Sequence, residues 1–72
     1  MQDIDMVQIG RRIKELRLFK NWTQTVLAQK LGVAQNTLSQ YEKGTAKTSI
    51  DIIVKLAHEL ETTTDYLLCG DQ

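Results

Sequence analysis

The chain has 72 residues, with nine basic and nine acidic side chains, and so carries no formal net charge at pH 7. A chain of this length makes one small domain, residues 1–72, which buries roughly 60% of the surface of its unfolded form. A single cysteine argues against an internal disulfide, and with only one histidine beside it a metal site is not expected. The N-terminus is acidic and is therefore unlike a signal peptide. No apolar run reaches about 18 residues, which argues against a membrane span. We therefore expect an intracellular protein.

The charges are spread unevenly along the chain. Residues 1–47 hold eight basic and four acidic side chains, whereas residues 48–72 hold one basic and five acidic side chains. Such asymmetry is expected of a chain with one surface that faces DNA.

The first predicted helix runs from about Met6 to Lys20, and residues 1–5, which lack an apolar repeat, are expected to fray. Asn21 suits the left-handed position that ends a helix, because it tolerates this conformation better than other residues with a side chain. Trp22 is expected to pack on the core and not to stack on a base. The inward stripe of the helix consists of Ile9, Ile13 and Leu16.

Residues 23–43 predict two short helices joined by a tight turn. Gly32 stands where the first of them should end, since a residue without Cβ takes the left-handed conformation cheaply. The small Ala28 allows the two helices to approach, and Val33 can fill the corner between them. This layout is the helix-turn-helix, whose second helix enters the DNA major groove.

The second of these helices has one polar face. At helical spacing, Leu38 and Tyr41 fall on the side opposite to a polar arc. An amide carries a donor and an acceptor together, as the reading of an adenine edge requires. A solvated helix face is the alternative, but the amide bias and the glycine turn together favour DNA reading. The polar arc contains Gln35, Asn36, Ser39, Gln40 and Lys43.

The stretch from Thr23 to Gly44 resembles the helix-turn-helix of lambdoid phage repressor and Cro proteins, the Xre-type regulators. The resemblance extends from about Gly10 to Leu68. It implies an all-α fold, a compact five-helix lambda-repressor-like domain that binds operator DNA, usually as a dimer. The residues at the family's spacing are Thr23, Gln24, Leu27, Ala28, Leu31, Gly32, Val33, Tyr41, Glu42 and Gly44.

The resemblance also assigns roles to single residues. Gln24 matches a glutamine that contacts the DNA backbone, at a helix start where exposed N–H groups favour a phosphate. Arg17 and Glu42 match a charged pair between the first and third helices, for which two unconnected surface charges are the alternative. Ala34 replaces the family's usual Ser or Thr, so the third helix should be weakly capped. The expected phosphate contacts are Thr23, Gln24, Lys43 and Lys47, and the expected base contacts are Gln35, Asn36, Gln40 and, as a further candidate, Ser39.

After the loop of residues 45–47, Thr48 is expected to cap a fourth helix from Ser49 to about Leu60, with Asp51 three residues on. His58 should lie on its solvated face. Its predicted inward stripe consists of Ile50, Ile53, Ala57 and Leu60.

A fifth helix should begin after Thr63 and end at Gly70, although Glu61 stands where Gly or Asn usually ends the preceding helix. Tyr66 and Leu67 are expected at a surface where two copies of the chain pair. Four apolar residues occupy positions that tend to be polar in relatives, and they could form a protein contact or have no role. They are Leu18, Phe19, Val26 and Ile52.

These observations predict a sequence-specific transcriptional regulator of the bacterial or phage-encoded cytoplasmic kind, with double-stranded DNA as its partner. A homodimer would repress by placing the third helix of each copy in successive major grooves of a palindromic operator. No nucleophile–base pair stands out, so an enzyme, a cofactor and a small-molecule ligand are not expected. The alternative is a protein-interaction module on the same scaffold, such as an antitoxin or controller protein acting mainly through a protein partner.

Overall fold

A computed structural model describes residues 4–70 and shows five helices and no strand in that range. The all-α, five-helix prediction is confirmed. No helix among these residues is long and apolar enough to cross a membrane. The helices are α1 (Met6–Phe19), α2 (Gln24–Leu31), α3 (Gln35–Lys43), α4 (Ile50–Glu59) and α5 (Thr64–Cys69).

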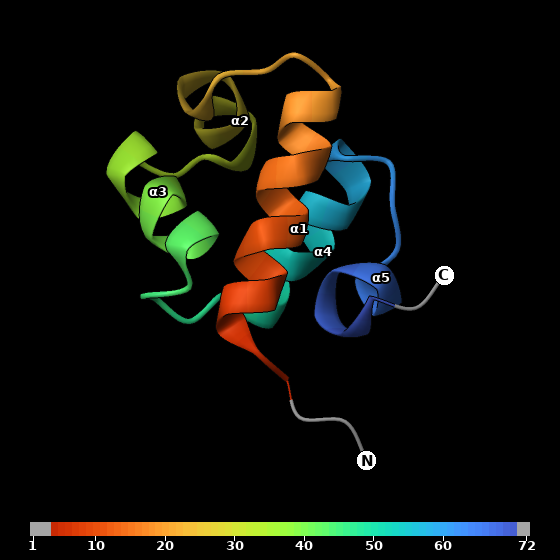
Figure 1. The fold of residues 1–72 in the computed structure, drawn as a ribbon. Helices are drawn as coiled ribbons and strands as arrows, with labels where there is room; N and C mark the ends of the chain where they lie inside the picture. Colours follow the sequence, from red (N-terminus) through yellow and green to blue (C-terminus); the bar gives the residue numbers. More distant parts are fainter. Residues whose placement is uncertain (1–3, 71–72) are drawn as a thin grey trace.

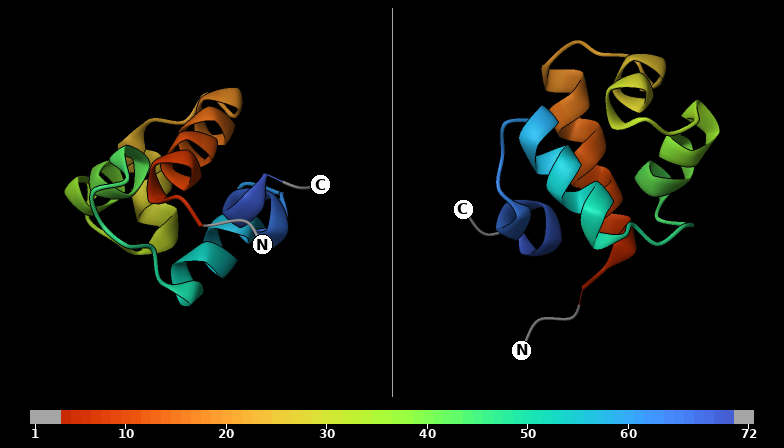
Figure 2. Two further views of the ribbon diagram at one scale, coloured as in Figure 1. Left: turned by 60° about the horizontal axis from the view of Figure 1, so that its bottom comes forward. Right: turned by 180° about the vertical axis from the view of Figure 1, so that it is seen from behind.

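Helix α1 runs through the middle of the molecule, with α2 and α3 on one side and α4 and α5 on the other (Figure 1). Seen from behind, α4 lies in front of α1 (Figure 2, right), and it packs against α2 and α5. The apolar core lies where these helices meet. Its buried members are Ile9, Ile13, Leu27, Ala28, Leu31, Leu38, Ile53, Leu56, Ala57, Leu60 and Leu67.

Four of the five helices begin at a side-chain cap, which satisfies a backbone N–H that has no partner within the helix. Asp5 caps α1 by accepting from the Val7 N–H at 2.9 Å, so the frayed segment predicted for residues 1–5 is wrong at Asp5. Residues 1–3 of that segment lie outside the described residues. The other capping side chains are Thr23, Ser49 and Thr63.

The predicted cap of α4 is wrong by one residue. Ser49, and not Thr48, accepts from the Ile52 N–H at 3.3 Å. Because a capping side chain bonds the N–H two or three residues ahead, Thr48 stands too early for a helix that begins at Ile50.

The inward stripe of α4 also differs from the prediction at its first residue. Ile53, Ala57 and Leu60 are buried as expected, and so is Leu56. Ile50 is 69% exposed because it is the first residue of α4, which begins at the edge of the molecule (Figure 2, left). A position on the inward side of α4 therefore did not suffice to bury Ile50.

The α4–α5 join turns through a left-handed residue that is not glycine. Glu61 has φ 56°, and Asn21 has φ 61° at the corresponding place after α1, as predicted for Asn21. The Glu61 carboxylate accepts from Lys20 Nζ across the surface. This hydrogen bond and the charge of Lys20 lower the pKa of Glu61 below its ordinary value of 4.5.

The four unusual apolar residues do not share one environment. Phe19 is 84% exposed and Leu18 is 52% exposed at the end of α1. Val26 is partly buried, and Ile52 packs against the core. Only the end of α1 therefore presents the apolar surface that was considered for all four.

Candidate nucleic-acid interface

The α2–turn–α3 unit is built as the sequence predicted. Gly32 ends α2 with φ 75°, and the next residue, Val33, donates its N–H to the Ala28 carbonyl at 3.0 Å. Ala28 and Leu38 are buried between the helices, and Val33 packs against the core at the corner. Gly44, with φ 76°, ends α3. These contacts set α3 at the side of the molecule, away from α4 and α5 (Figure 1).

The candidate base-reading residues lie on the outer part of α3. Gln35, Asn36 and Gln40 are exposed, and Ser39 is partly exposed. Of the nine residues of α3, only Leu38 and Glu42 are buried. The helix thus offers amide and hydroxyl groups to a partner at the side opposite to its core contact.

The start of α3 lacks a side-chain cap. Ala34 occupies the capping position with extended backbone and makes no capping hydrogen bond, as predicted. The first N–H groups of α3 consequently have no capping side chain, next to the amides of Gln35 and Asn36.

Three of the candidate phosphate contacts differ in how free their side chains are. The Thr23 hydroxyl accepts from the Val26 N–H at 3.2 Å, so it is occupied as a cap. Lys43 and Lys47 are exposed, and neither forms an ion pair with another residue of the described range 4–70. Gln24, the fourth candidate, is part of a hydrogen-bonded chain that involves a buried ion pair.

Arg17 and Glu42 form that buried ion pair between α1 and α3. Arg17 Nε lies 2.7 Å from Glu42 Oε2, and Arg17 Nη2 donates to Glu42 Oε1 at 3.1 Å. The side chains are only 8% and 3% exposed, which excludes two unconnected surface charges. Arg17 Nη1 also donates to the Trp22 carbonyl at 2.8 Å, which ties the pair to the α1–α2 corner.

From this ion pair a chain of amides leads to the surface. Gln24 Nε2 donates to Glu42 Oε1 at 3.0 Å, and Gln24 Oε1 accepts from Gln35 Nε2. The predicted roles of these residues, a phosphate contact for Gln24 and a base contact for Gln35, did not include a contact between them. Their positions in the sequence could have indicated the contact, because Gln24 and Gln35 are the first residues of two helices that a short turn joins.

The backbones of α1 and α3 make a close contact beside the ion pair, where Gly10 faces the carbonyl groups of Tyr41 and Glu42. A Cβ on Gly10 would lie 2.3 Å from the Glu42 carbonyl oxygen and 2.4 Å from that of Tyr41. Real Cβ atoms do not come so near to oxygen, so glycine is required here for steric reasons. From the sequence, Gly10 was identified only as the approximate start of the family resemblance.

Trp22 covers the corner before α2. Its ring packs against the core, as predicted, and its faces attract two lysines: Lys20 Nζ lies 5.3 Å and Lys30 Nζ 4.7 Å from the ring centroid. Both distances fall within the range of cation–π attraction. Positive charge is thereby gathered beside the start of α2.

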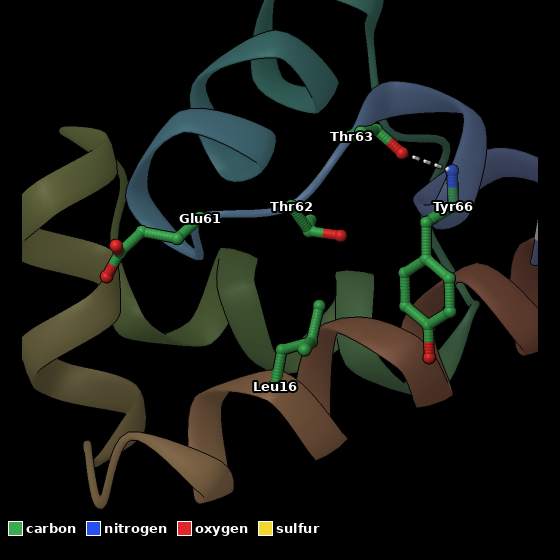
Figure 3. A pocket seen from close by; sticks show the side chains of 5 residues that line it. All are labelled: Leu16, Glu61, Thr62, Thr63 and Tyr66. Atoms are coloured by element: carbon green, nitrogen blue, oxygen red, sulfur yellow. Dashed lines mark hydrogen bonds between the residues drawn. The ribbon is translucent and has the colours of Figure 1, made fainter. Parts of the chain in front are cut away.

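The surface predicted for pairing two copies is only partly available. Leu67 is wholly buried, because α5 packs this residue against α1 and α4, so its prediction as a surface residue is wrong. Tyr66 is partly exposed and lines a pocket of about 350 Å³ toward which Leu16 points from α1 (Figure 3). The pocket is lined by Leu16, Glu61, Thr62, Thr63 and Tyr66.

The sequence and the fold are similar to those of known regulators. The HTH-type transcriptional regulator ImmR of Bacillus subtilis (strain 168) is 36% identical over 66 residues, which are 92% of this chain and 52% of ImmR. The P22 c2 repressor protein, solved in complex with a synthetic operator, has TM-score 0.83 and 30% identity over 88% of this chain and 96% of the repressor chain. The restriction-modification controller protein C.AhdI from Aeromonas hydrophila has TM-score 0.83 and 33% identity, over 89% and 97% of the two chains.

This chain spans about half the length of the curated relatives it matches. The match to the family described as Helix-turn-helix covers residues 13–67, which is most of the chain and includes all of α2, α3 and α4. The chain belongs to the helix-turn-helix family, in the Xre-type group of transcriptional regulators that its sequence resembles.

Proposed function

We propose that this protein is a sequence-specific DNA-binding regulator that represses transcription by occupying an operator. The observation that carries the proposal is the outer face of α3, where the amides of Gln35, Asn36 and Gln40 are exposed and where Gln35 donates to Gln24. Similarity to a repressor solved with operator DNA supports it. On this proposal the protein works in the cytoplasm of a bacterium, where its DNA lies.

In this proposal Gln35, Asn36 and Gln40 hydrogen-bond to base edges in the major groove, and Ser39 is available for a further base contact. Lys43 and Lys47 contact phosphates on either side of the loop that follows α3. The Gln24 amide and the N–H groups at the start of α2 contact a phosphate as well. Such backbone contacts fix the register of the protein on the duplex without reading sequence.

We further propose that two copies bind one operator. A single α3 covers only a few base pairs, which is too short a site to be unique in a genome that offers about 10⁶ or more competing sites. Two-fold pairing doubles the length that is read. Because Leu67 is buried, the pairing surface at α5 would be formed by Tyr66 and its neighbours in the pocket.

Selection of bound sites from random DNA tests binding, sequence and symmetry together. We expect a palindromic site with half-sites about one helical turn apart. On that site Gln35→Ala should weaken binding by about 1–3 kcal/mol and should have much less effect on scrambled DNA. Enrichment of no site, or an equal loss on both DNAs, would contradict base reading by α3.

The matched control is Lys43→Gln, which removes a positive charge from the same helix. It should weaken binding to all sequences alike and should flatten the slope of log K against log salt by roughly one unit. An unchanged slope would place Lys43 away from the DNA backbone.

A second candidate function is a protein-interaction module, which the exposed Phe19 and Leu18 favour. Large apolar side chains at the end of one helix are suited to a protein contact. This second function would be favoured if the protein did not bind DNA, or if its binding to DNA did not weaken as salt is added.

A further inference from the structure

The hydrogen-bonded chain from the core to Gln35 has a direction. It passes from Glu42 Oε1 to Gln24 Nε2, and then from Gln24 Oε1 to Gln35 Nε2. Each amide has one donor end and one acceptor end, so the orientation of one amide determines what the next must present. The orientation of the whole chain is therefore set wherever one member has no choice.

Glu42 is the member without a choice. Its carboxylate pairs with the Arg17 guanidinium, which accepts no hydrogen bond, and a carboxylate only accepts. Gln24 must consequently turn its NH₂ group inward, which leaves its carbonyl oxygen toward Gln35. Gln35 must then donate one N–H to that oxygen, and its own carbonyl oxygen and its second N–H remain free to bond a partner.

What Gln35 keeps is one acceptor and one donor, side by side. In the major groove adenine offers the N6 amino donor beside the N7 acceptor, whereas guanine offers two acceptors, O6 and N7. If the chain ran the other way, Gln35 would accept from Gln24 and would turn two N–H donors outward, which suits guanine. The direction of the chain thus distinguishes two base preferences.

We propose that Glu42 is a positioning residue that sets the hydrogen-bond direction of Gln24 and Gln35, and so makes Gln35 prefer adenine to guanine. Glu42 does this from inside the protein, through Gln24, without touching DNA. The proposal rests on the function proposed above, since it concerns how the α3 face reads a base. It gives the buried carboxylate a role in specificity besides its role in holding α1 to α3.

A test without DNA uses the side-chain amide resonances of the free protein. Glu42→Gln replaces the carboxylate by a group that can donate or accept, so the direction of the chain is no longer enforced. The Gln35 side-chain amide resonances should shift, because Gln35 is linked to Glu42 through Gln24. Those of Gln29, an exposed glutamine on α2, should stay in place. Unmoved Gln35 resonances in a folded Glu42→Gln protein would overturn the proposal.

A binding test uses Gln24→Met, which removes the hydrogen bonds of Gln24 to Glu42 and Gln35 but leaves the Arg17–Glu42 ion pair intact. The base pair that Gln35 reads is first identified as the one at which Gln35→Ala loses preference. At that position the protein should favour adenine over guanine by about tenfold or more. Gln24→Met should reduce this ratio to less than about threefold, while Gln29→Met should leave it unchanged.

The outcomes separate this proposal from the proposed function. If Gln35→Ala relaxes the preference at one base pair but Gln24→Met leaves the adenine-to-guanine ratio intact, direction-setting is wrong and base reading stands. A preference for guanine at that base pair would also overturn it. If the protein selects no sequence at all, the proposed function fails, and the resonance experiment still decides whether Glu42 orients Gln35.

Discussion

The two sides of α1 are held by different kinds of interaction. Toward α3, the contacts are directional: a backbone approach at Gly10, the Arg17–Glu42 ion pair, and the amides that continue from it. Toward α4 and α5, the contacts are mostly apolar and buried, with Arg12 Nη1 donating to the Leu67 carbonyl at 3.0 Å. Hydrophobic burial has no direction, whereas hydrogen bonds fix angles. Directional contacts of this kind specify the orientation of α3 on α1, which apolar burial alone does not.

The largest expected effect comes from breaking the directional side. Arg17→Met leaves the Glu42 carboxylate buried without its counter-charge, and it should lower the free energy of unfolding by about 3–5 kcal/mol. Urea unfolding followed by circular dichroism measures this. A loss below about 1 kcal/mol, the usual value of an exposed pair, would show that the ion pair is weak.

The double variant Arg17→Met/Glu42→Leu sharpens that result. With no charge left in the core, much of the lost stability should return, because apolar residues often replace a buried ion pair at little cost. If the directional contacts serve orientation, this folded variant should nevertheless discriminate bases less well than the unaltered protein.

On the apolar side, Leu67→Ala removes a wholly buried side chain of α5. Leu67→Ala should lower the free energy of unfolding by about 2–5 kcal/mol through lost burial and the cavity that remains. Thermal melting measures this, and a nearly unchanged melting temperature would contradict the burial of Leu67.

Tyr66→Ala, at the neighbouring and partly exposed position, should instead reduce the difference in affinity between a full-site and a half-site duplex. Binding to the two duplexes measures this difference, with thermal melting as the control for stability.

The smallest effect concerns the start of α4. Ser49→Ala should cost about 1 kcal/mol, because it removes the hydroxyl that accepts from the Ile52 N–H. Thr48→Ala, one residue earlier, should change stability by less than about 0.5 kcal/mol. Equal losses from the two changes would mean that the cap is shared.

Much of the fold could be predicted because helix limits depend on local chemistry. Thr23, Gly32 and Gly44 mark the ends of α2 and α3 through their own backbone conformations and hydroxyl groups, and each stands as predicted. The cap of α4 was predicted one residue too early, at Thr48, because the prediction made Ser49 the first residue of the helix and not its cap.

Other features depend on where distant parts of the chain meet. The burial of Leu67 depends on how α5 settles on α1 and α4, which the helical period of one short helix does not reveal. The contact of Gln24 with Glu42 and Gln35 joins three helix ends that are separate in the sequence. The roles of Gln35 and its neighbours on DNA remain predictions that the experiments above address.

Trp22 gives the protein a built-in optical reporter. It is the only tryptophan in the chain, and its ring lies close to both Lys20 and Lys30 at the corner that leads into α2. Indole emission responds to nearby charges and to water, and a phosphate bound at the start of α2 would alter both around this ring. Titration with unlabelled DNA should therefore be visible in the intrinsic fluorescence of the unmodified protein, with no dye attached to either partner.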